Sequence, residues 1–393
     1  VDDETVVWTD DFRFDATAEG AALIDLRFPG AKGQFSLGRF DKTRHVAGLA
    51  TQVMAGMMPR DAGTLAIPPQ LKGLIAPGNG AQISAVLSFD PRRPASEVQV
   101  YQDGVLSDRI DVTGRVSLPL SVPRLPGTRW VTLIAANAQG LESVALSRDL
   151  GPPVAPAHRR ALIVGVDRYQ DDRLPALNYA KSDADRLLNA LQTRAYQSVA
   201  LVDRRASAPA VLAALSELVD GLSPGDSGVV FFAGHGRRDG AGKFYLGTSQ
   251  MDLDHPEDGA LAWSDVAAIL ARSRAKITVL LDACHSGAAG TTAFASNDDA
   301  VAALSSIPSN VTILAASKGR ETSAEDARQG GELFTTALVE VLGAGSEKAD
   351  TNHNGSLEVS EFYRGVKAAV QARGASQTPW IARSRLVGDY SLF

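Results

Sequence analysis

The sequence contains a single cysteine among its 393 residues, so no disulfide bond can form within the chain. Cysteine usage therefore gives no indication of a redox compartment. No run approaches the roughly 18 apolar residues of a membrane-spanning helix. No basic run occurs either, and the formal net charge is -6, which argues against nucleic-acid binding and favours cationic partners. What remains is an ordinary globular composition, with 45% hydrophobic and 21% charged residues.

The chain divides at a proline-rich stretch. Residues 151–159 read GPPVAPAHR, a composition typical of a linker. Before it, residues 80–150 alternate polar and apolar positions in short runs separated by Gly, Pro and Asp. This pattern predicts a small immunoglobulin-like β-sandwich, without the paired cysteines of antibody domains. Residues 1–79 form an N-terminal extension that we expect to be β-rich.

The part after the linker, residues 160–393, alternates strand and helix patterns. Apolar runs predict buried strands near 161–166, 198–202, 228–233, 277–281 and 311–315. Helical spacing and end signals predict helices within 174–191 and over 207–222. Alternating units of this kind imply the α/β class, a mainly parallel sheet with helices on both faces, preceded by the small all-β domain.

Two of the predicted strands lead to residues with catalytic chemistry. His235 follows the run VVFFA, and Cys284 follows ITVLLDA. Since ligands bind at the carboxyl ends of parallel strands, these side chains can meet there. A thiol needs a nearby imidazole to populate its reactive thiolate, so Cys284 is the candidate nucleophile and His235 its base. The amide N–H groups of Gly236 and Cys284 could then stabilise an oxyanion.

A structural interpretation of the same residues stays open. A lone free cysteine is most often a small buried hydrophobic residue, and a lone histidine a hydrogen-bonded core residue. The flanking glycines and the polar residues around the thiol favour catalysis. His285 is a second candidate base, but adjacent residues at a strand end usually point in opposite directions, so we favour His235.

These motifs carry a family resemblance. The segments GHG at 234–236 and DACHSG at 282–287 resemble the His and Cys boxes of the caspase-like cysteine peptidases, and are most similar to those of bacterial metacaspases, also called orthocaspases. Three further segments match in the same order: ALIVGVDRY at 161–169, LPALNYAKSDADRLLNAL at 174–191 and ILAASKGRETSAED at 313–326. The resemblance covers roughly residues 160–393. It implies a caspase-like fold that cleaves peptide bonds with Cys284 as nucleophile and His235 as base.

The resemblance also implies a substrate preference. Metacaspases cleave after Arg or Lys, and Asp183 and Asp282 match the two carboxylates of their acidic P1 pocket. Two carboxylates in a partly dry pocket favour a cationic side chain and repel an aspartate. The alternatives are that Asp183 stabilises the start of a helix and that Asp282 satisfies backbone donors at a strand end. The expected partners are therefore proteins or peptides with basic residues.

A calcium-binding motif lies near the C-terminus. Residues 350–361 read DTNHNGSLEVSE and fit the twelve-residue EF-hand loop. Its oxygen ligands would be Asp350, Asn352, Asn354, Ser356 through its carbonyl, Glu358 through water, and Glu361 through both carboxylate oxygens. Gly343 and Gly345 weaken the entering helix, so we expect a structural Ca²⁺ ion more than a sensor site. A polar turn without calcium is the alternative.

Two other charge patterns bear on regulation. The acidic run at 251–258 is a solvated loop, an electrostatic funnel for basic peptides or part of a calcium-dependent activation site, and no ligands can be named in it. The segment 285–317 contains no Lys or Arg. An enzyme specific for those residues could not cut itself there, so we expect an active single chain or cleavage elsewhere.

Two alternatives to an Arg/Lys-specific endopeptidase remain. One is a catalytically silent caspase-fold scaffold that binds or signals, and the other is a peptidase with Asp at P1. The first residue is Val1 and not an initiator methionine, which fits a processed secreted or periplasmic protein or a trimmed chain, with a cytoplasmic location still open. The sequence leaves the oligomeric state undecided.

Overall fold

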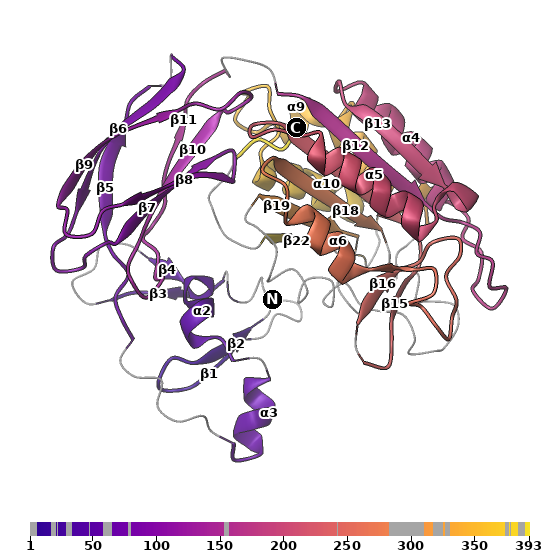
Figure 1. The fold of residues 1–393 in the computed structure, drawn as a ribbon, viewed down its shortest axis with the longest axis horizontal. Coiled ribbons are helices and arrows are strands. Elements are labelled where there is room, and N and C mark those ends of the chain that lie inside the picture. The colour runs from indigo at the N-terminus through magenta and orange to yellow at the C-terminus, as the bar shows by residue number, and fades with distance from the viewer. Residues whose placement is uncertain are drawn as a thin grey trace. The chain divides into compact units, whose positions relative to one another are not determined.

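The computed structural model describes most of the chain. The described residues are 6–16, 21, 23–28, 34–46, 48–57, 65–77, 80–152, 157–241, 243–282, 310–316, 325–326, 331–373, 377, 379–383 and 390–393. They form two compact units (Figure 1). The first comprises Val1–Tyr101, Leu106–Arg124 and Val131–Gly151, and the second Gln102–Val105, Leu125–Trp130 and Pro152–Phe393.

Two small sheets build the larger part of the first unit. One has the order β11-β10-β7-β8, and the other, with the order β5-β6-β9, is antiparallel. Their strands are β5 Leu71–Ile75, β6 Gln82–Phe89, β7 Glu97–Gln102, β8 Val105–Asp111, β9 Ser117–Pro123, β10 Trp130–Ala136 and β11 Leu146–Asp149. Leu87, Val100 and Leu133 share one core cluster drawn from both sheets. Every second residue of β6 is buried, as expected for a strand with one face on a core. The predicted antiparallel all-β region is confirmed, and its immunoglobulin-like character stays a prediction.

The N-terminal part of the first unit combines short strands with short helices. Its elements are β1 Val6–Trp8, β2 Phe14–Ala16, β3 Asp25–Leu26, β4 Phe35–Ser36, the 3-10 helix η1 Leu37–Phe40, α2 Asp41–Arg44 and α3 Leu49–Met54. Phe14, Phe35 and Phe40 form its core. The expectation of strands here holds for four short elements, and the three short helices follow β4.

A six-stranded sheet with the order β13-β12-β14-β18-β19-β22 forms the centre of the second unit. Its strands are β12 Arg159–Gly165, β13 Gln197–Val202, β14 Ser227–Ala233, β18 Lys276–Asp282, β19 Val311–Ala315 and β22 Trp380–Arg383. The first five are parallel, and β22 pairs antiparallel with β19. All five strands predicted from apolar runs are present. The predicted mainly parallel α/β fold is therefore confirmed.

Helices cover both faces of this sheet. One face packs against α4 Ala180–Gln192, α8 Leu333–Leu342 and α10 Val359–Gln371. The other packs against α5 Ala208–Asp220 and α6 Trp263–Leu270 (Figure 1). Successive residues of the buried strands point to opposite faces of the sheet. Phe231 of β14 lies in the core with α4, α8 and α10, and Phe232 lies in the core with α5 and α6. A strand buried on both faces explains why its sequence is continuously apolar.

Smaller elements surround the sheet. They are the 3-10 helix η2 Asp203–Arg205, the antiparallel sheet of β15 Gly236–Arg238, β16 Phe244–Leu246 and β17 Leu261–Ala262, the pair β20 Glu325–Asp326 and β21 Gly331–Glu332, and the single-turn helix α9 Ser346–Ala349. In the part of the chain that the structure describes, no helix is long and apolar enough to cross a membrane.

The second unit includes two segments that precede the linker in sequence. In the first, the buried carboxylate of Asp103 lies 3.6 Å from the ammonium of Lys276, the first residue of β18. The same carboxylate accepts the backbone N–H groups of Arg129 and Trp130 from the second segment. Gly104 lies against the ring of Tyr390, where a Cβ atom would come within 2.3 Å of a ring carbon. These contacts make both segments part of the second unit.

Candidate functional site

The strands that carry the two catalytic candidates end level with each other. Ala233, the last residue of β14, pairs with Asp282, the last residue of β18. Gly234 donates its N–H to the carbonyl of Asp282 at 3.1 Å, which continues the pairing beyond the strand. His235 and Cys284 each follow two residues after this pair. Cys284 lies outside the described residues, so the structure places the approach to the thiol and not the thiol itself.

The imidazole of His235 is buried and oriented by a backbone carbonyl. The side chain is 1% exposed, and its Nε2 atom lies 2.9 Å from the carbonyl oxygen of Pro175. Because a carbonyl oxygen can only accept, Nε2 carries the proton in this contact. In a neutral imidazole, Nδ1 is then the proton acceptor. The predicted base is therefore held in one tautomer.

Tyr169 fixes the backbone of the same histidine. Its hydroxyl accepts the N–H of His235 at 2.9 Å and donates to the carbonyl of Val166, just beyond β12, at 3.1 Å. The two rings are 4.8 Å apart and inclined by 34°. Burial raises the pKa of the Tyr169 phenol far above its ordinary range, so the hydroxyl remains a donor at any physiological pH. Tyr169 thus links the end of β12 to the loop that presents His235.

Asp183, one of the two predicted pocket carboxylates, lies in the first turns of α4 and is fully buried. Its Oδ2 atom accepts the backbone N–H of Glu332 at 2.8 Å, and its Oδ1 atom lies 3.3 Å from the guanidinium of Arg186. Burial raises the pKa of Asp183 to about 7, although the Glu332 amide and Arg186 oppose this increase. The carboxyl is therefore close to half ionised at neutral pH.

Asp282, the other predicted pocket carboxylate, contacts the same helix start. Its Oδ2 atom accepts a hydrogen bond from the hydroxyl of Thr335 at 3.2 Å. Glu332 is the N-cap residue of α8, and Thr335 lies in its first turn, so the two predicted carboxylates contact one short segment. Thr336, the next residue, bonds Arg186 at 3.1 Å and completes the connection. The structure thus brings Asp183 and Asp282 to one region of the unit.

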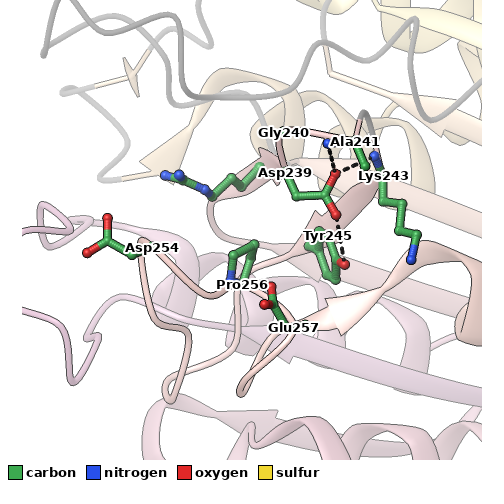
Figure 2. A pocket seen from close by; sticks show the side chains of 9 residues that line it. Asp239, Gly240, Ala241, Lys243, Tyr245, Asp254, Pro256 and Glu257 are labelled. Atoms are coloured by element: carbon green, nitrogen blue, oxygen red, sulfur yellow. Dashed lines mark hydrogen bonds between the residues drawn. The ribbon is translucent and has the colours of Figure 1, made fainter.

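Gly236, the predicted oxyanion donor, begins β15 and pairs with Leu246 of β16. A cavity of about 430 Å³ lies beside this hairpin (Figure 2). In its wall, Asp239 accepts the N–H groups of Ala241 and Lys243 and the hydroxyl of Tyr245, at 2.9, 2.8 and 3.2 Å. These bonds hold the hairpin that follows His235 in a fixed conformation.

The acidic run at 251–258 is partly neutralised. Arg173, in the loop that also contains Pro175, forms an ion pair with Asp254 at 2.7 Å and lies 3.9 Å from Asp252. Arg173 also binds Asp171 at 2.7 Å. Asp252 accepts the N–H groups of Asp254 and His255. The acidic run therefore binds, through Arg173, the loop whose Pro175 carbonyl orients His235.

The EF-hand-like loop has the turns that its sequence predicts. Gly355 adopts a left-handed conformation with φ of 77°, where the loop must turn sharply. The carboxylate of Asp350 accepts the N–H groups of Asn354 and Gly355, and the side-chain oxygens of Asn352 and Asn354 accept those of Asn354 and Ser356. The side-chain oxygens of these three of the six predicted ligands thus face the loop interior.

The two glutamates at the end of the loop cap α10. Glu358 and Glu361 form a capping box, and Glu361 accepts the N–H groups of Thr351 and Asn352 at 2.9 and 3.2 Å. Trp130 donates its indole N–H to Glu358 at 3.3 Å. Burial and the neighbouring Glu361 raise the pKa of Glu358. Among the described residues, no three His, Cys, Asp or Glu side chains are grouped to hold a metal ion. Because the Oε1 atom of Glu361 accepts two backbone N–H groups, a calcium ion bound through both carboxylate oxygens would have to displace these partners.

Sequence reasoning missed several contributors to this site. Pro175 acts through a backbone carbonyl, which every residue possesses, so its identity gives no signal. Tyr169 follows an apolar run, where an aromatic residue is indistinguishable from a core residue. Glu332 and Thr335 contact Asp183 and Asp282 only because α8 begins beside them. Spacing between motifs could not have revealed these contacts.

Residues 158–391 match the family model described as the caspase domain. The solved structure of protein GSU0716 from Geobacter sulfurreducens is similar with a TM-score of 0.45 and 18% sequence identity, over 58% of this chain and 93% of that one. No curated protein matches the chain.

Proposed function

The chain belongs to the caspase-domain family, and on that premise we propose that it is a cysteine endopeptidase that cleaves after Arg or Lys with Cys284 and His235. One observation supports this assignment most strongly. Ala233 and Asp282, the last residues of β14 and β18, are paired, so the two strands end at the same level. Each candidate residue follows two positions after its strand. A nucleophile and a base delivered in this way can reach one bond.

The orientation of His235 determines how the proton would move. With Nε2–H donated to Pro175, the Nδ1 atom takes the thiol proton of Cys284. The thiolate attacks the peptide carbonyl carbon, and the imidazolium then protonates the leaving amine, which gives an acyl-enzyme. Water, deprotonated by the same imidazole, releases the acid and restores the thiol. The amide groups of Gly236 and Cys284 are the proposed donors to the oxyanion.

Asp183 and Asp282 are the proposed acceptors of the basic P1 side chain. Both are buried, and an arginine that enters beside them would form charge-assisted hydrogen bonds in a dry environment. Arg186 already offsets part of the charge of Asp183. A P1 aspartate would meet like charges instead.

Calcium is the proposed ligand of the loop at 350–361. The donor set of carboxylate, amide and carbonyl oxygens suits this hard cation. When bound, Ca²⁺ would take the place of the backbone amides that Glu361 accepts. The buried Glu358 would gain a positive neighbour, which favours its ionised form. The single-turn helix α9 before the loop supports a stabilising role more than a large conformational switch.

Hydrolysis of paired fluorogenic peptides tests the proposed activity. Peptides that end in Arg or Asp would be incubated with the full chain, with and without Ca²⁺, and Cys284→Ala would serve as the blank. Arg-specific turnover that is lost in the variant supports the proposal. Turnover only of the Asp peptide would move the assignment to Asp at P1. No turnover of either peptide would favour a caspase-fold scaffold.

A further inference from the structure

A basic cavity lies at the carboxyl edge of the central sheet, apart from the residues discussed so far. It has a volume of about 660 Å³. Its walls carry four cationic side chains and two carboxylates. The lining residues are Arg168, Lys181, Asp185, Val202, Asp203, Arg204 and Arg205. In a chain of formal net charge -6, this local excess of positive charge is notable.

The cations of this cavity come from three separate segments. Arg168 follows β12, Lys181 lies in the first turn of α4, and Arg204 and Arg205 belong to η2. All four side chains are exposed. Within the described ranges none of the four forms a salt bridge with the chain itself. Their charge is therefore available to a ligand.

Asp203 holds part of the cavity wall in place. Its Oδ1 atom accepts the backbone N–H groups of Asp167 and Arg168 at 2.9 and 3.2 Å. Its backbone adopts a left-handed conformation with φ of 45°, which aspartate tolerates better than most residues. This turn positions η2 next to the loop after β12. One carboxylate oxygen of Asp203 is therefore used in hydrogen bonds that organise the cavity wall. The other carboxylate of the cavity is Asp185, so two carboxylates face four cationic side chains.

The cavity lies close to the catalytic histidine along the same sheet edge. Gly165 of β12 pairs with Val202 on one side and with Ala233 on the other. Val202 and Ala233 are therefore two strand spacings apart, roughly 10 Å. An extended polypeptide advances roughly 3.3 Å per residue, so about three residues span this distance. A peptide held near His235 can reach the cavity.

We propose that this cavity binds acidic side chains of a polypeptide that lies across the carboxyl edge of the sheet. Exposed arginine and lysine groups attract carboxylates, and their attraction adds when several converge on one site. That this polypeptide is the substrate rests on the proposed peptidase function, whereas binding itself does not. The enzyme would then select a basic residue at the scissile bond together with acidic residues about three positions away.

Binding is tested with a labelled tetraglutamate peptide that contains no Lys or Arg. Fluorescence anisotropy would be measured on the full chain carrying Cys284→Ala. The double variant R204E/R205E should weaken binding at least ten-fold. The control R272E/R274E changes two exposed arginines just before β18, at the opposite edge of the sheet, and should keep the affinity within two-fold. Equal loss in both pairs, or no saturable binding, overturns the proposal.

Two further arms distinguish the sources of an anion. If inorganic phosphate binds to the chain and tetraglutamate does not, the cavity is not a peptide site and the proposal is overturned. Arg-P1 substrates with glutamates three residues from the scissile bond, on either side, should be cleaved faster than glutamine analogues by the wild type and at equal rates by R204E/R205E. If no peptide is cleaved at all, the peptidase assignment fails, and the anisotropy result still decides the role of the cavity.

Discussion

The hydroxyl of Tyr169 accepts the backbone N–H of His235 at 2.9 Å while the two rings lie 4.8 Å apart. The same hydroxyl donates to Val166, so one side chain holds the loop of His235 to the end of β12. We therefore expect Tyr169 to act by positioning His235.

Replacement of Tyr169 by Phe should lower kcat/KM about five-fold, since the hydrogen bond to the His235 amide contributes about 1 kcal/mol and the ring contact remains. KM should change little, because the loss concerns the base and not the P1 pocket. The control is Tyr245→Phe, which removes a hydroxyl from the neighbouring hairpin. Equal effects of the two variants would contradict a specific role for Tyr169.

Asp282→Asn should reduce cleavage after Arg about 100-fold, because a charge-assisted contact becomes a neutral one in a buried site. Steady-state kinetics with the Arg peptide would measure this loss. Asp265→Asn, at an exposed position of α6, should leave turnover unchanged. Full activity of Asp282→Asn would remove this residue from the pocket.

The raised pKa of Asp183 predicts a pH-dependent affinity. Burial brings this pKa to about 7, so the carboxyl gains its charge between about pH 6 and pH 8. Calorimetry of an arginine amide with Cys284→Ala should show several-fold tighter binding at pH 8 than at pH 6. The additional variant Asp183→Asn should flatten this dependence. A slope that survives in that variant would assign it to another group.

The same group affects stability with the opposite sense. In the unfolded chain its pKa is 3.8, so between pH 3.8 and about 7 the folded state holds a proton that the unfolded state has lost. Its contribution to the free energy of unfolding therefore decreases as the pH rises through this window. Urea unfolding at pH 5 and pH 7 should show a smaller pH dependence in Asp183→Asn than in the wild type.

Calcium should raise the melting temperature by about 5 to 10 °C when present at 100 times its Kd, because the ion binds only the folded loop. Glu361→Gln should abolish this increase, and Glu347→Gln, in the exposed part of α9, should not. Trp130 offers a second readout, since its indole N–H contacts Glu358. If Ca²⁺ produces no thermal shift and no fluorescence change relative to EGTA, the proposed calcium site is refuted.

The buried pair of Asp103 and Lys276 should be essential for stability. Asp103→Ala leaves the Lys276 ammonium without its carboxylate and should cost about 3 to 5 kcal/mol of the free energy of unfolding. The double variant D103L/K276M removes both charges and should recover most of this loss. Urea denaturation of the full chain measures both. A double variant no better than Asp103→Ala would show that the pair itself is not the cause.

The sequence predicted the central sheet because strands buried on both faces must be apolar throughout, and it predicted α4 and α5 because their buried residues recur at helical spacing. It did not predict β22, whose only distinction is antiparallel pairing with β19 at the sheet edge. For the candidate site, the sequence indicated the residues whose side chains are chemically reactive or charged, such as His235 and Asp282. Contacts made by backbone groups, such as the Pro175 carbonyl, depend on where distant segments meet, and residue type does not encode them.

The inclusion of residues 102–105 and 125–130 in the second unit bears on how such a protein could arise. If recombination exchanged the sequence on one side of the proline-rich linker, Lys276 would lose its partner Asp103, and Tyr390 would lose its contact with Gly104. Recombination at that point would therefore transfer only part of the second unit. The regions before and after the linker are expected to have diverged together, as one inherited piece, and not as modules shuffled between unrelated partners.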